Sequence, residues 1–167
     1  METMIRSVLR ILQFLWVLLT TALIGNVIAT NGGNVGNPAL HFVMFVCALS
    51  WIAVLYGLAM HFVSAIAMPI VALVLDGLAV LFTLIAAIAL AAKLGAVNCN
   101  NLEGKDPGYI AFGSGDDEKR CREIQASTVF LWFLFAAFVG TLFYVFKEFR
   151  RGGGSIRRGP NMSQIGV

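Results

Sequence analysis

The chain has 167 residues, of which 59% are hydrophobic and 13% are charged, and its formal net charge is +3. A soluble domain of this size has too little interior to bury so much apolar surface, and a disordered chain is poor in these residues. The composition excludes both classes and indicates an integral membrane protein with one domain. The basic residues form no stripe with interleaved aromatic residues, so no nucleic-acid partner is expected.

Four hydrophobic segments are long enough to cross a bilayer, which takes about 20 residues. Helices are expected, because an irregular crossing would leave backbone groups unsatisfied in hydrocarbon. The first segment, which follows Arg6 and contains Arg10, is too long for the apolar region of a signal peptide. We therefore predict an all-α membrane protein, a four-transmembrane-helix bundle formed by residues 1–149. The predicted spans are residues 8–29, 40–63, 69–94 and 126–146.

Asp76 is the only acidic residue within a predicted span. A lipid-facing carboxylate is costly, so an ionisable residue at this depth is a candidate functional site. No second acid, histidine or lysine lies at that depth to form a proton relay. Two interpretations stay open: Asp76 hydrogen-bonds Tyr or Gln and ties helices together, which we favour, or it lines a transport path. The polar residues at similar depth on the other spans are Gln13, Tyr56, Thr141 and Tyr144.

Small residues recur at intervals of four on three spans, and such stripes let helices approach closely. The fourth span also carries aromatic residues on all faces, more than one bundle can bury. We therefore expect a homo-oligomer. The spacing of the small residues fits both packing within one bundle and self-association, so it does not distinguish them. The stripes are Ala53 and Gly57, then Thr83, Ala87, Ala91 and Gly95, then Ala136 and Gly140.

The one long loop, residues 96–125, carries Cys99 and Cys121. Four spans put both termini on one side, where seven of the twelve basic residues lie, and this bias favours cytosolic termini. Two cysteines in an outer loop favour a disulfide; the alternative is two free thiols in a cytosolic loop. No histidine lies nearby to complete a metal-ligand set, so no metal is expected.

The predicted cytosolic tail, residues 150–167, combines a Gly-rich segment with arginines and is expected to be flexible. These arginines would attract anionic lipid head groups, or act only as topology-determining charges. They are Arg150, Arg151, Arg157 and Arg158.

No enzyme emerges from the motifs. The chain has no His-rich metal pattern, no Gly-rich phosphate loop and no convergent Ser/His/Asp set. We therefore expect no catalytic residue and no cofactor. The candidate small-molecule ligands are membrane lipids, either sphingolipid or sterol.

Several short motifs stand out in the long loop, in the third span and at the end of the tail. They are Leu75-Asp76, Cys99-Asn100-Asn101, Gly113-Ser114-Gly115, Arg120-Cys121-Arg122, Gln125-Ala126 and Ser163-Gln164-Ile165-Gly166-Val167. With these motifs, the layout of spans, ends and loop resembles that of MARVEL-domain proteins. Within that group, the chain is similar to the fungal, eisosome-associated non-classical export protein family.

The resemblance implies a plasma-membrane domain organiser rather than a catalyst. It implies self-association, lipid binding, eisosome and membrane-furrow assembly with BAR-domain scaffold proteins, a response to sphingolipid supply, and a role in non-classical export. The alternative function is a small channel or transporter that uses Asp76. The lack of paired intramembrane charges and of interrupted helix pairs in the sequence favours the organiser.

Overall fold

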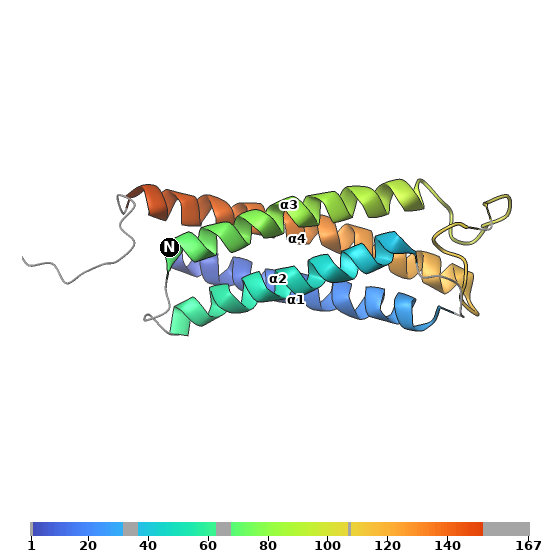
Figure 1. Ribbon diagram of the computed structural model, residues 1–167, viewed down its shortest axis with the longest axis horizontal. Helices are drawn as coiled ribbons and strands as arrows, with labels where there is room; N and C mark the ends of the chain where they lie inside the picture. Colours follow the sequence, from blue (N-terminus) through green and yellow to red (C-terminus); the bar gives the residue numbers. More distant parts are fainter. Residues whose placement is uncertain (1, 32–36, 63–67, 107, 152–167) are drawn as a thin grey trace, which may run out of the picture.

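The computed structural model describes residues 2–31, 37–62, 68–106 and 108–151. Within them the chain forms four long helices that run side by side along one axis (Figure 1). These are α1 (Glu2–Ala29), α2 (Pro38–Phe62), α3 (Pro69–Leu94) and α4 (Asp117–Arg151). The predicted all-α, four-helix membrane architecture is confirmed, since all four helices are long and apolar enough to cross a membrane.

Each helix packs against two neighbours, so the bundle has two diagonals. The packed pairs are α1 with α2, α2 with α3, α3 with α4, and α4 with α1. Within the described residues, the backbones of α1 and α3 make no close contact with each other. We call the end where α1 begins and α4 ends the proximal end, on the left in Figure 1, and the end with the long loop the distal end.

Local sequence sets the helix ends. The Asn37 side chain accepts a hydrogen bond from the Ala39 N–H at 3.0 Å, which caps the start of α2 beside Pro38. Pro69 occupies the first turn of α3, and Gly95, at a φ of 65°, ends it. Helix α3 therefore has the bounds of the predicted third span.

Helix α4 begins earlier than the predicted fourth span. Asp117 and Glu118 lie in its first turn, where acidic side chains favour a helix N-terminus. Arg122 and Glu118, four residues apart, form an ion pair at 2.6 Å. The last nine residues of the predicted loop, 117–125, are therefore helical.

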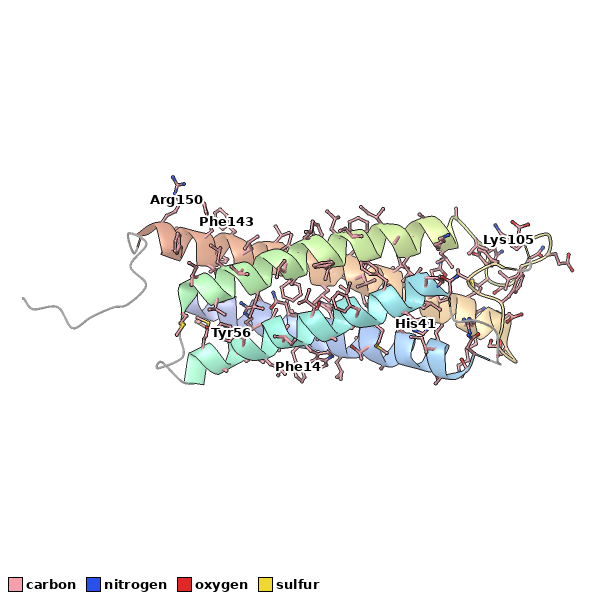
Figure 2. All side chains as sticks on the ribbon, in the orientation of Figure 1. Phe14, His41, Tyr56, Lys105, Phe143 and Arg150 are labelled. Carbon is pink, nitrogen blue, oxygen red and sulfur yellow. A yellow bond between two sulfur atoms is a disulfide. The ribbon has the colours of Figure 1, made fainter. Side chains whose placement is uncertain are left out.

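The bundle is apolar on both its inside and its outside. Fully buried side chains such as Phe138, Leu134 and Leu90 fill the core. Large apolar side chains also project outward from every helix, and Figure 2 shows them along the length of the bundle. In water such a belt would be an aggregation surface, whereas in a bilayer it faces lipid. Examples are Ile11, Ile52, Leu81, Trp132 and Phe143.

Candidate functional site

Arg10 and Asp76 form a buried ion pair in the proximal half of the bundle. The Arg10 guanidinium donates from Nη1 to Asp76 Oδ1 at 2.9 Å and from Nη2 to Asp76 Oδ2 at 2.6 Å. Arg10 is 5% exposed and Asp76 is 1% exposed. This two-bond geometry matches the planar fork of a guanidinium to a carboxylate, and each charge neutralises the other.

Gln13 extends the pair to α4. It lies one turn after Arg10 on the same face of α1, and its Oε1 accepts from Arg10 Nη1 at 2.9 Å. Its Nε2 donates to the Thr141 hydroxyl at 2.9 Å and to the Ala137 carbonyl at 3.1 Å. The Thr141 hydroxyl in turn donates to the Phe138 carbonyl at 3.0 Å. The polar atoms thus have partners inside the bundle.

Helix α2 contributes room for the Arg10 guanidinium, at Gly57, rather than a polar side chain. A Cβ atom at Gly57 would overlap Cζ and Nε of Arg10 and would lie 2.9 Å from its Nη2. The guanidinium therefore lies against the backbone of α2, at a position that an added Cβ could occupy only if the guanidinium moved. All four helices meet here, and we call Arg10, Gln13, Gly57, Asp76 and Thr141 the polar layer.

The polar layer only partly matches the residues predicted at this depth. Gln13 and Thr141 do lie in it with Asp76, but two tyrosines lie elsewhere. The Tyr56 hydroxyl lies 3.4 Å from both the backbone N and the backbone O of Met68. The Tyr144 ring packs against the Phe143 ring, with 5.8 Å between the two ring centres. The structure gives Asp76 an arginine as its partner instead.

The expectation that the spans hold no paired charges is wrong, because Arg10 pairs with Asp76. Sequence reasoning treated Arg10 as a topology signal near the start of the first span. The equal depth shows only in the structure, because α1 begins at Glu2, six residues before the predicted span: Arg10 lies eight residues after that start, and Asp76 lies seven after the start of α3. At the helical rise of 1.5 Å per residue both lie about 10–12 Å from the proximal end.

The small residues divide between the inside and the outside of the bundle. Ala53, Thr83 and Ala87 are fully buried, so they serve packing between helices of one chain. At Gly140, an added Cβ would lie 3.3 Å from Leu9 Cδ1, so this glycine lets α1 and α4 approach closely. Ala136 is exposed on the outer face of α4, as is Gly95 beyond α3, and Ala91 is half-buried.

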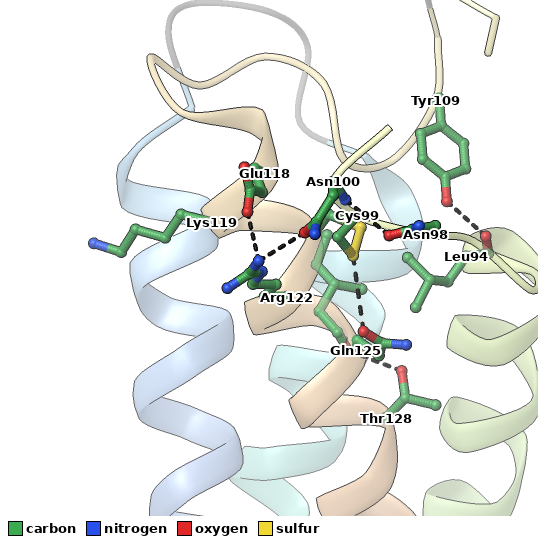
Figure 3. Close-up of a disulfide and its surroundings, with 12 residues drawn as sticks. Leu94, Asn98, Cys99, Asn100, Tyr109, Glu118, Lys119, Arg122, Gln125 and Thr128 are labelled. Atoms are coloured by element: carbon green, nitrogen blue, oxygen red, sulfur yellow. Dashed lines mark hydrogen bonds and ion pairs between the residues drawn. A yellow bond between two sulfur atoms is a disulfide. The ribbon is translucent and has the colours of Figure 1, made fainter. Parts of the chain in front are cut away.

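At the distal end a disulfide joins Cys99, in the loop, to Cys121, in the second turn of α4. Figure 3 shows its surroundings. Arg122 donates to Asn100 Oδ1 at 2.7 Å, and Gln125 Oε1 lies 3.7 Å from Cys99 Sγ. These contacts hold the start of the loop against α4.

Tyr109 and Arg120 anchor the rest of the loop. The Tyr109 hydroxyl donates to the Leu94 carbonyl at 2.6 Å, and burial raises the pKa of this phenol. Arg120 is buried and donates to the carbonyls of Ile110, in the loop, and of Val27, in the last turn of α1, at 3.2 and 3.1 Å. Carbonyls at a helix C-terminus lack partners within the helix, so Arg120 fastens α1 to α4.

The distal end also has a cleft of about 230 Å³ between the end of α1 and the start of α4. Its polar groups largely satisfy one another: Asn26 donates to Glu123 at 2.8 Å, and Lys119 lies 4.0 Å from the same carboxylate oxygen. Over the part of the chain that the structure describes, no group of three or more His, Cys, Asp or Glu side chains could hold a metal ion.

At the proximal end of α4, the guanidinium of Arg150 lies over the Phe146 ring, 5.6 Å from its centre. Figure 2 shows Arg150 projecting outward from the end of the helix. The side chain of Arg151, and Arg157 and Arg158 entirely, lie outside the described residues.

Comparison with known proteins places this architecture in a family. Residues 3–144 match the MARVEL family, described as a membrane-associating domain. Non-classical export protein 2 of Saccharomyces cerevisiae is 34% identical over 166 residues, which cover 96% of this chain and 93% of that protein. Non-classical export protein 102 of Candida albicans is 34% identical over 147 residues, which cover 87% and 84%.

No solved structure matches the chain significantly. The family match runs from α1 to residue 144 in α4, and MARVEL is a membrane-associating family rather than an enzyme family. The protein therefore belongs to the MARVEL family of multi-pass membrane proteins and is related to the fungal non-classical export proteins.

Proposed function

We propose that the protein is a plasma-membrane domain organiser. It self-associates, binds lipid such as sphingolipid or sterol, and supports eisosome and membrane-furrow assembly and the response to sphingolipid supply. Its termini face the cytosol, where BAR-domain scaffold proteins are its partners and the tail arginines attract anionic lipid. It performs no catalysis. The names of its relatives extend the proposal to a role in non-classical export.

The observation that carries the proposal is the division of polar and apolar surface. Arg10 and Asp76 satisfy each other inside the bundle, while the outward faces of all four helices present large apolar side chains. A protein built in this way offers its surroundings an apolar belt. Lipid tails and other copies of the chain are the natural occupants of such a belt, because close packing drives association in lipid.

Self-association is proposed to use the outer face of α4. Exposed Ala136 lies between exposed Trp132 and Val139, so a small residue interrupts a ridge of large ones. A closed ring would use a head-to-tail contact between unlike faces of neighbouring copies. The gaps between such copies would hold lipid.

The test is cross-linking and mass measurement of the full chain in nanodiscs, with Ala136→Phe as the test variant. Leu81→Phe, on the exposed outer face of α3, is the matched control. We expect oligomers in the wild type and the control, and fewer oligomers in Ala136→Phe. In cells the test variant should also lose its concentration in plasma-membrane domains. A wild-type protein that stays monomeric at high density in lipid would overturn the proposal.

The transporter alternative gains one specific observation, which is the charged pair at membrane depth. Charged residues inside spans often mark ion or substrate pathways. However, the two charged groups bond each other, and Arg10 also donates to Gln13, so both are directed into the bundle rather than outward. Proton and ion flux through purified protein in liposomes discriminates the two functions. We expect no flux above that of empty liposomes, and a flux abolished by Asp76→Asn would favour transport.

A further inference from the structure

The Arg10–Asp76 pair joins two helices whose backbones are otherwise apart. Helices α1 and α3 lie on a diagonal of the bundle, and their backbones make no close contact within the described residues. The two hydrogen bonds between guanidinium and carboxylate cross that diagonal. We propose that Arg10, Asp76 and Gly57 form an ionic lock, which holds the proximal half of the bundle closed and whose release admits water to the core.

The first argument is steric. On its way to Asp76 the guanidinium passes the bare backbone of α2 at Gly57, where an added Cβ would overlap it. A methyl group at that position would displace the Arg10 head group, although it changes no charge and suits a helix. Gly57 therefore contributes to the lock by leaving room for the guanidinium, not by forming a hydrogen bond.

The second argument is electrostatic. A buried charge that has lost its partner is strongly unfavourable in an apolar interior. The cheapest response for a charge about 10 Å from the helix ends is to move outward or to let water in. Removal of either partner should therefore separate the helices near the proximal end rather than leave a closed bundle.

The third argument is the contrast between the two ends. At the distal end, a disulfide and the buried Arg120 fasten the loop, α1 and α4 together. At the proximal end, within the described residues, no disulfide joins the helices, and the Tyr56 hydroxyl lies 3.4 Å from the backbone of Met68, the residue before α3. Opening is thus expected at the proximal end, with the distal end as the fixed point.

The first test uses a cysteine reporter at Ala79, which is fully buried on α3 one turn beyond Asp76. The full chain carries Cys47→Ala and Ala79→Cys, and a water-soluble thiol reagent is added to it in nanodiscs. We expect slow labelling with the lock intact and faster labelling in Asp76→Asn and Arg10→Met. The double variant Arg10→Met/Asp76→Leu should label slowly again, because no charge remains to be hydrated.

A matched control separates opening from general loss of stability. Leu90→Ala removes a fully buried side chain from the distal half of α3 without changing any charge. It should lower Tm yet leave the reporter slow to label. Equal labelling of the reporter in all variants, or fast labelling in the double variant, would overturn the lock.

The second test needs no change of charge. Gly57→Ala should lower Tm by roughly 5–15 °C in the wild type, since it breaks the pair. In the Arg10→Met/Asp76→Leu background the same substitution should leave Tm unchanged or raise it, because alanine favours a helix more than glycine does. An equal fall of Tm in both backgrounds would show that Gly57 acts through packing alone and would contradict the proposal.

Discussion

At the scale of single residues, the polar layer shows how a bilayer protein tolerates charge. Arg10 and Asp76 are each surrounded by apolar helices, and each is acceptable only in the presence of the other. Gln13 uses its carbonyl oxygen towards Arg10 and its amide group towards Thr141, so it fits the layer in one orientation. The role of each of these side chains follows from its neighbours rather than from its type.

Asp76→Asn is predicted to destabilise the protein, although it is nearly isosteric. The substitution leaves the Arg10 charge buried without a counter-ion, which costs about 3–5 kcal/mol. The double variant Arg10→Met/Asp76→Leu should cost less than Arg10→Met or Asp76→Leu alone. Thermal unfolding of the four proteins in nanodiscs measures the cycle, and additive single effects would contradict the coupling.

Arg120→Met is predicted to loosen the distal end. It removes the donors to the Val27 and Ile110 carbonyls and leaves both without that partner, at a cost of about 1–3 kcal/mol. Hydrogen exchange of the last turn of α1 and of residues 108–116 should increase. The exposed Lys119→Met, one residue away, serves as the control and should leave exchange unchanged.

At the scale of elements, the sequence predicts what depends on local signals. Pro69 and Gly95 mark the two ends of α3. The apolar run between them is long enough to predict a membrane-spanning helix without any information about the helices that pack against it. The early start of α4 was not predicted, because its first turns are charged and gain stability from the Glu118–Arg122 pair and the Cys121 disulfide. The Arg10–Asp76 pairing was also not predicted, since the faces that meet are set by how four helices rotate against one another.

The disulfide gives a prediction at this scale. Non-reducing mass spectrometry of the native protein should find Cys99 and Cys121 in one linked peptide pair. Cys99→Ala/Cys121→Ala should cost roughly 3 kcal/mol in the chain-entropy description and speed proteolysis in the loop at exposed Lys105. Cys47→Ala, a buried cysteine outside the disulfide, is the control. Two free thiols in protein alkylated under oxidising conditions would contradict the pairing.

At the scale of the whole molecule, the four helices form a body whose two ends differ. The distal end is cross-linked, with buried polar anchors under its loop, and the proximal end carries the polar layer and the basic end of α4. Between them the surface is apolar on every side. Such a body stands in a bilayer with its long axis across the membrane.

Orientation is the testable consequence at this scale. Protease added to the outside of intact spheroplasts should cut the loop at exposed Lys105 and leave the tail beyond Arg151 uncut. The acceptor pattern Asn161-Met162-Ser163 should also carry no glycan if the tail faces the cytosol, as proposed. A glycan at Asn161, or cleavage of the tail from outside, would reverse the topology.

The diagonal bond between Arg10 and Asp76 also has a consequence for biogenesis. The two residues are 66 positions apart, so the ribosome delivers α1 to the membrane well before the carboxylate partner exists. During that interval the guanidinium can remain hydrated only by reaching back towards the head groups, which its long side chain and shallow depth allow. We therefore expect the first helix to reach its final depth only after the third is inserted, so that α1 in a nascent chain that stops before Asp76 should lie closer to the head groups.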